Sequence, residues 1–256
     1  LIDPTSLGVC MTHEHLLIDL SDLLPPPNTA SARSFYNENM SFHVAGLCRN
    51  HYELNSSHHK LDSIETAVDE LNIYKKYGGN SIVELTLSDI YRDPIGLAKI
   101  SKATGINIVM GCGFYVNASH PKGFSEWSEE EIVEKIVSDI VYGAKVDLYS
   151  PSTSQGLSNS LNTGVKAGVI GEIGCSSPLQ DDERKCLRAS AKAQNRTGAC
   201  IFVHPGREET APLEIIDELC LAGANLNRVV IAHLDRTVFS RDILKIIAKS
   251  GVYLSY

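Results

Sequence analysis

The sequence predicts an α/β protein, a (β/α)8 barrel of the TIM type in which the eighth strand and the last helix are missing. Short apolar runs alternate with amphipathic stretches along the chain, and this alternation is typical of a parallel sheet covered by helices. The length of 256 residues suits one such barrel. We therefore expect a single, incomplete barrel domain over residues 1–256.

The apolar runs predict seven strands, and a helix is expected after each of the first six. We expect strands at 9–15, 81–87, 106–115, 167–174, 200–204, 229–234 and 251–256. Apolar residues at helical spacing predict helices at 61–77, 93–104, 128–142, 181–197, 211–222 and 240–249. A doubly wound open sheet is the alternative, but its usual Gly-rich phosphate loop does not follow the first strand here.

Two polar segments interrupt this alternation. A long polar stretch with three consecutive prolines, Pro25-Pro26-Pro27, follows the first strand. Residues 150–164 are rich in Ser, Thr, Asn, Gln and Gly. Such a composition buries too little apolar surface to order itself, so we expect a flexible surface loop at 150–164.

Composition and charge exclude several classes of protein. The net charge of −8 argues against nucleic-acid binding, which needs clustered Lys and Arg. No apolar run approaches the roughly 20 residues that a membrane span requires, and no signal peptide is visible. The seven cysteines are odd in number and include no C-x-x-C pair, which favours reduced thiols. We expect a cytoplasmic enzyme with a small-molecule substrate, and a homodimer is one assembly that the sequence allows.

Four histidines lie at the expected ends of apolar strands. Side chains alternate along a strand, so His13 and His15 face the same side, and His204 and His233 each end a later apolar run. Barrel active sites lie at the carboxyl ends of the strands. A lone pair of histidines is often structural, but four in these positions favour metal ligands. The other five histidines are expected to be solvated loop residues, with His120 close enough to a strand end to border the site.

Glu172 lies within an apolar strand, in Gly171-Glu172-Ile173-Gly174. A buried carboxylate needs a partner, and the candidates are a pair of bridged metal ions or a salt bridge to an arginine. Two ions would hold a bridging hydroxide and polarise a carbonyl or phosphoryl oxygen. Zinc suits imidazole and carboxylate ligands, while manganese or another divalent ion remains open. The flanking glycines would let other groups approach closely.

Five motifs together resemble those of the phosphotriesterase family of the amidohydrolase superfamily, and its animal branch in particular. They are Thr12-His13-Glu14-His15-Leu16, Gly113-Phe114-Tyr115-Val116, Ile170-Gly171-Glu172-Ile173-Gly174-Cys175, His204-Pro205-Gly206-Arg207 and His233-Leu234-Asp235-Arg236-Thr237. The resemblance implies a barrel with two divalent ions. It assigns His13 and His15 to the more buried ion and His204 and His233 to the other. Glu172 would bridge both, where bacterial phosphotriesterases carry a carboxylated lysine.

The resemblance also implies a reaction. The animal branch is associated with hydrolysis of N-acetyltaurine to taurine and acetate, so an N-acyl amidohydrolase is the leading expectation. A lactonase or phosphotriesterase is the alternative. A sulfonate substrate would need a cation near the ions, for which Arg207 and Arg236 are candidates, and Tyr115 could line the pocket. Loop salt bridges for the two arginines and a packing role for Tyr115 are the competing interpretations.

The chain departs from the family pattern at its end. The family has an aspartate at the end of the eighth strand that binds the first ion and transfers the proton, and this sequence ends in the expected seventh strand. Asp235 is near a ligand but lies two residues past it, toward the loop. From these 256 residues alone we expect weak metal binding and little or no turnover, and an inactive fragment is the non-enzymatic alternative.

Overall fold

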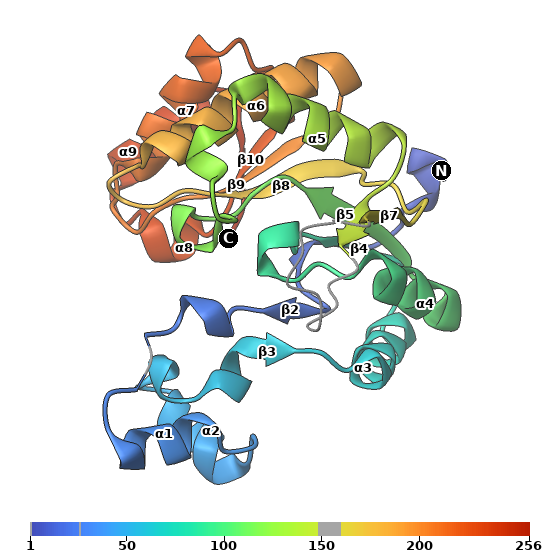
Figure 1. Cartoon of the computed structure of the whole chain (residues 1–256). Helices are drawn as coiled ribbons and strands as arrows, with labels where there is room; N and C mark the ends of the chain where they lie inside the picture. Colours follow the sequence, from blue (N-terminus) through green and yellow to red (C-terminus); the bar gives the residue numbers. More distant parts are fainter. Residues whose placement is uncertain (1, 26, 148–159) are drawn as a thin grey trace.

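A curled sheet of seven parallel strands forms the centre of the molecule (Figure 1). The computed structural model describes residues 2–25, 27–147 and 160–256. The strand order is β1-β4-β5-β8-β9-β10-β11, with every neighbouring pair parallel. The strands are β1 (Cys10–Glu14), β4 (Ser81–Glu84), β5 (Asn107–Cys112), β8 (Val169–Gly174), β9 (Ile201–His204), β10 (Val229–Ile231) and β11 (Tyr253–Leu254). The seven predicted strands and their parallel arrangement are confirmed.

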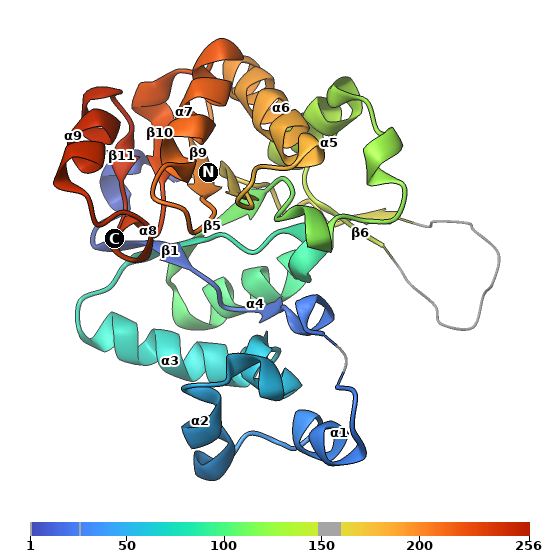
Figure 2. The ribbon, with the colours of Figure 1, turned by 90° about the vertical axis from the view of Figure 1, so that its left-hand side faces the viewer.

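Helices follow the first six of these strands and lie along the outside of the sheet (Figures 1 and 2). They are α3 (Ile64–Lys76), α4 (Pro94–Thr104), α5 (Glu129–Val141), α6 (Asp181–Thr197), α7 (Ala211–Leu221) and α9 (Arg241–Lys249), with the short α8 (Leu234–Thr237) before α9. The Ser128 side chain caps α5 and Glu131 completes a capping box, which explains why this boundary is readable from the sequence. Among the described residues, we find no helix with the length and apolar character of a membrane span.

Side chains that alternate between the two faces of the sheet divide the hydrophobic core into two clusters. Ile82, Ile170 and Ile201 belong to the large cluster that contains the buried residues of the helices. Their neighbours Val83, Val169 and Phe202 form a small cluster with Leu85. Successive residues of one strand therefore pack on opposite faces, and the small cluster marks the concave face of the curled sheet, on which the candidate site lies.

The polar segments contain more structure than the sequence predicts. After β1 the chain forms β2 (Ile18–Asp19), which pairs antiparallel with β3 (Lys60–Leu61), and between them lie α1 (Ala30–Tyr36) and α2 (Phe42–Cys48). Short 3-10 helices occupy further connections: η1 (Pro4–Ser6), η2 (Ser21–Leu23), η3 (Tyr52–Leu54), η4 (Ser56–His59), η5 (Ser88–Ile90), η6 (Asn117–Ser119), η7 (Phe124–Glu126) and η8 (Leu226–Arg228). Elements this short give almost no periodic signal, so sequence patterns miss them.

The last part of the predicted flexible loop at 150–164 contains a short strand that the sequence analysis did not predict. Ser160–Asn162 forms β7, which pairs antiparallel with β6 (Lys145–Asp147). Pairing with β6 provides hydrogen-bond partners for the backbone N–H and C=O groups of β7. The amino-acid composition of the segment cannot reveal such a partner. Residues 150–159 lie outside the described residues.

Two side chains hold the backbone of Tyr115, just beyond β5. Asp89 of η5 accepts hydrogen bonds through Oδ2 from the Tyr115 N–H, at 2.8 Å, and from the Ser119 hydroxyl, at 2.9 Å. His120 Nε2 lies 2.9 Å from the Tyr115 carbonyl oxygen, to which it donates. His120 is half-buried rather than a solvated loop residue, so that expectation is wrong for this histidine. The two contacts place the Tyr115 side chain relative to the strand ends.

Asp89 should give the stability of the protein a specific pH dependence. Burial raises the pKa of Asp89 to about 6, against the hydrogen bonds that lower it. A raised carboxyl pKa contributes stability that is fully present below the unfolded-state value of about 4 and is lost as the pH rises through about 6. We expect the free energy of unfolding of the wild type, relative to that of Asp89→Asn, to fall by about 2 kcal/mol between pH 4 and 7.

Urea unfolding of both proteins at a series of pH values measures this difference. Asp242→Asn is the matched control, because it removes a carboxylate whose side chain is 88% exposed and should leave the slope unchanged. Parallel stability curves for the wild type and Asp89→Asn would contradict the assignment.

Candidate metal centre

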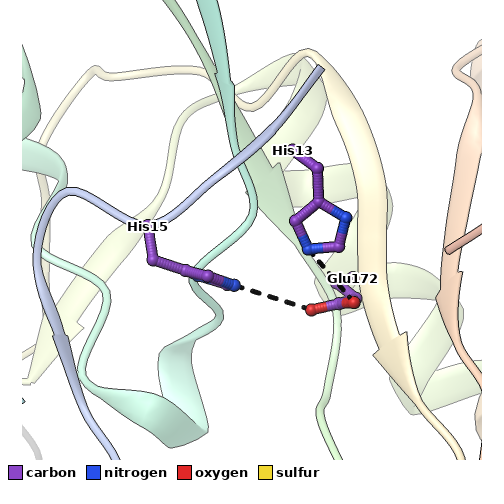
Figure 3. Close-up of side chains that lie close together, drawn as sticks. All are labelled: His13, His15 and Glu172. Carbon is purple, nitrogen blue, oxygen red and sulfur yellow. Dashed lines mark ion pairs between the residues drawn. The ribbon is translucent and has the colours of Figure 1, made fainter. Parts of the chain in front are cut away.

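Four histidines and one glutamate meet at the carboxyl ends of β1, β8, β9 and β10. His13 lies in β1 and His15 directly follows that strand, Glu172 lies in β8, and His204 is the last residue of β9. Figure 3 shows both His13 and His15 pointing toward Glu172. The predicted orientation of the His-x-His pair to one side is therefore confirmed.

Irregular backbone brings several of these residues inward. The pairing register shifts between Met11 and Glu14 in β1 and between Ile170 and Ile173 in β8. Because Val169 packs in the concave cluster and Ile170 in the outer one, strict alternation would point Glu172 outward. The local irregularity redirects its side chain, as β-bulges beside active sites commonly do.

His233 reaches the site in a different way from the prediction. The strand β10 ends at Ile231, two residues earlier, so His233 does not end a strand. Its backbone is left-handed, with φ of 56°, and it directly precedes α8. Residues other than glycine adopt this conformation at an energetic cost and do so preferentially at functional sites. This turn directs the imidazole to Glu172.

Glu172 is the common partner of all four histidines. Only 1% of its surface is exposed. Its carboxylate oxygens lie near one nitrogen of each imidazole: His13 Nε2 at 3.2 Å, His15 Nε2 at 3.7 Å, His204 Nδ1 at 3.0 Å and His233 Nε2 at 2.7 Å. Burial opposes ionisation of this carboxyl, but the adjacent imidazoles of His13, His15 and His204 hold its pKa well below the usual value. An ionised, buried carboxylate is therefore surrounded by imidazoles.

The same five residues form two groups of metal-ligand type that share Glu172. One is His13, His15 and Glu172, the other is Glu172, His204 and His233, and within each the ligand atoms lie within 4.8 Å of one another. His13 Nε2 is buried and has no hydrogen-bond partner among the residues that the structure describes. Imidazole and carboxylate are suitable ligands for zinc and similar divalent ions. The residues present thus fit a metal centre.

Glycines allow the backbone to pack closely around Glu172. A Cβ on Gly171 would lie 2.2 Å from the carbonyl oxygen of Phe202, and one on Gly174 would lie 2.2 Å from the Val116 nitrogen. Gly171 also has φ of +115°, where other residues are strained. The sequence-based interpretation of these flanking glycines as sites of close approach agrees with these distances.

The three predicted substrate-binding residues lie around His204. The Tyr115 hydroxyl is 3.3 Å from His204 Nδ1, and Arg236 Nη2 is 3.0 Å from His204 Nε2. Arg207 is exposed and, with His204, Cys175 and Ser176, lines a pocket of 370 Å³. Burial and the positive charge of Arg207 both lower the pKa of Arg236. The two guanidinium groups therefore interact electrostatically beside the ligands.

Sequence reasoning missed two residues beside the site. Glu84, at the end of β4, and Thr86 are both fully buried, and the Thr86 hydroxyl lies 3.0 Å from His15 Nδ1. The signal that identified Glu172, an acidic residue within an apolar strand, is also present at Glu84 in Ser81-Ile82-Val83-Glu84. Asp235, in contrast, is exposed.

Known proteins resemble the whole chain. It matches the phosphotriesterase family over residues 1–256. An N-acetyltaurine hydrolase of Dictyostelium discoideum is 39% identical over 276 residues, covering 100% of this chain and 70% of the relative, and one of Xenopus tropicalis is 37% identical over 259 residues, covering 100% and 68%.

The fold agrees with that match. The crystal structure of a resiniferatoxin-binding protein from Rhodobacter sphaeroides superposes with a TM-score of 0.86 at 30% identity, covering 99% of this chain and 66% of that one. The chain thus spans about two thirds of the length of the relatives it matches. Its seven strands correspond to an incomplete turn of a TIM-type barrel. The motifs, the fold and the match along its full length agree, and the chain belongs to the phosphotriesterase family, a family of hydrolases.

Proposed function

We propose that this protein is a hydrolase with two divalent metal ions that cleaves the amide bond of N-acetyltaurine or of related N-acyl taurines and N-acyl amino acids. The observation that carries the proposal is the pair of ligand groups that share the buried Glu172. Relatives at 39% and 37% identity are named N-acetyltaurine hydrolases, and this name supports the choice of substrate.

The ligands divide between two positions in this proposal. His13 and His15 would hold one ion and His204 and His233 the other, with Glu172 available to both. Zinc is the ion we propose, with manganese as the alternative. When bound, such ions polarise a carbonyl oxygen and make water nucleophilic at neutral pH. Burial lowers the pKa of His204 despite the nearby Glu172 carboxylate, and the neutral imidazole is the form that binds a metal ion.

The surroundings of His204 suit an anionic substrate. Arg207 and Arg236 provide two positive charges beside the 370 Å³ pocket, and a sulfonate offers three acceptor oxygens to them. Burial raises the pKa of Tyr115, so its hydroxyl stays protonated and can donate to a substrate oxygen. These three residues orient the substrate, and the ligand set determines where the scissile carbonyl lies.

The proposal extends to the compartment. All seven cysteines are free, which supports a reducing compartment such as the cytoplasm.

Replacing the shared carboxylate should abolish both metal positions together. After equilibration with excess zinc, we expect the wild type to bind about two zinc ions per chain, however weakly, and Glu172→Gln to bind about none, because a neutral amide is a much weaker ligand than a carboxylate. Elemental mass spectrometry after gel filtration measures the content. His43→Asn, which changes an exposed histidine outside the site, is the control. A Glu172→Gln chain that keeps both ions would overturn the ligand assignment.

Relative rates should separate the proposed reaction from its alternatives. We expect the zinc-loaded chain to hydrolyse N-acetyltaurine faster than a lactone or an organophosphate ester, however slow the absolute rate. Release of taurine, lactone opening and phenol release are the respective readouts, with Glu172→Gln as the blank. Faster cleavage of the lactone or of the organophosphate would replace the proposed function by that of an esterase.

Arg207 should contribute to recognition of the sulfonate. We choose Arg207 because changing Arg236 would also disturb His204. For Arg207→Gln we expect N-acetyltaurine to bind about 5- to 10-fold more weakly to the zinc-loaded chain, from the loss of one charge-assisted contact. Calorimetry with N-acetyltaurine and with uncharged N-acetylpropylamine measures this difference, and Arg241→Gln, an exposed arginine on α9, is the control. Equal weakening of both compounds would show that Arg207 does not read the sulfonate.

A further inference from the structure

His15 has a second polar partner on the side away from Glu172. Its Nε2 lies 3.7 Å from Glu172 Oε2, while its Nδ1 lies 3.0 Å from the hydroxyl oxygen of Thr86. Thr86 is fully buried and lies two residues past the end of β4. The two ring nitrogens of a histidine are distinct, and the hydrogen bond of one determines whether the other carries a lone pair.

The hydrogen bonds of Glu84 determine the direction of this contact. Glu84 Oε1 accepts from the Thr86 hydroxyl and from the Leu16 N–H at 3.2 Å, and Oε2 accepts from the Thr86 N–H at 3.3 Å. Both oxygens therefore face backbone donors. The single hydroxyl proton of Thr86 is used toward Glu84, so the Thr86 oxygen can only accept from His15.

Burial acts on Glu84 in the opposite sense from these contacts. It raises the pKa of the carboxyl, while the hydrogen bonds from Thr86 and Leu16 lower it. Both carboxylate oxygens of Glu84 accept backbone N–H groups, so we take Glu84 as ionised, with the Thr86 proton pointing at Oε1.

We propose that Glu84 and Thr86 are positioning residues that hold His15 with its proton on Nδ1 and its Nε2 lone pair directed at the metal position shared with His13 and Glu172. Glu84 also binds the backbone of Leu16, the residue after His15, so it orients both the ring and the chain that carries it. This inference rests on the proposed metal centre. It goes beyond the ligand set, because it assigns a role to two residues that contact no ion.

The inference distinguishes the two metal positions. His204 has a different outer environment, made of Tyr115 and Arg236. Loss of the Thr86 hydroxyl should therefore weaken the ion held by His13 and His15 and leave the ion held by His204 and His233 largely unchanged. Residues that orient a metal-bound histidine typically contribute 10- to 100-fold to metal affinity.

Zinc titration against a competing chelator tests this asymmetry. For Thr86→Val, which keeps the shape of the buried side chain, we expect one of two zinc ions to bind about 10- to 100-fold more weakly. Thr86→Ser restores the hydroxyl and should bind both ions within a few-fold of the wild type. Thr104→Val is the matched control, because it removes a buried threonine hydroxyl that bonds the Ile100 carbonyl. Equal affinities for Thr86→Val and Thr86→Ser would overturn the proposal, as would an equal loss in Thr104→Val.

A second readout needs no bound metal. Nitrogen-15 NMR of the metal-free chain, at a pH where the imidazole is neutral, identifies which ring nitrogen of His15 carries the proton. We expect Nδ1–H in the wild type and in Thr86→Ser, and a mixture of tautomers in Thr86→Val. A wild-type proton on Nε2 would overturn the relay. If the wild type bound no zinc, the metal centre would be refuted, and this spectrum would still decide the tautomer.

Discussion

The burial of one carboxylate constrains the rest of this structure. Glu172 has only 1% of its surface exposed, and a charge removed from water is unfavourable unless it is paired. Four imidazoles from three other regions of the chain converge on it. The ends of β1, β9 and β10 must therefore lie at one level around β8, which a curled parallel sheet provides because all its strands point the same way.

Regular strands alone would not place these side chains. The register shifts in β1 and β8 and the left-handed backbone of His233 each depart from ideal geometry, and each lies at or beside a ligand. Gly171 lets the Phe202 carbonyl approach where any Cβ would collide. The irregular backbone is thus concentrated where the ligands must meet, as expected when local strain is retained for a site rather than for stability.

Polar residues behind the ligands hold them in place. Thr86 contacts His15 and in turn bonds Glu84, Arg236 contacts His204, and Asp89 holds the backbone of Tyr115, whose hydroxyl also reaches His204. These supporting residues lie at the end of β4 or in the segments that follow β4, β5 and β10. The histidines of β1 and β9 are therefore contacted by segments that follow neighbouring strands. Arg236 lies in the connection after β10 and Arg207 in the connection after β9, so the proposed recognition of the substrate also depends on the connections that follow the strands.

The sequence by itself determined the order of strands and helices and the identities of the five residues that meet at the candidate metal centre. Apolar periodicity reports which face of an element is buried, and a His or Glu inside an apolar run is costly without a partner. Only the tertiary structure decided that Glu172 turns inward, that His233 lies beyond its strand, and that Glu84 and Thr86 stand behind His15. These features depend on bulges and on contacts between residues far apart in the chain, such as the 3.0 Å contact of His15 with Thr86, and no local pattern encodes them.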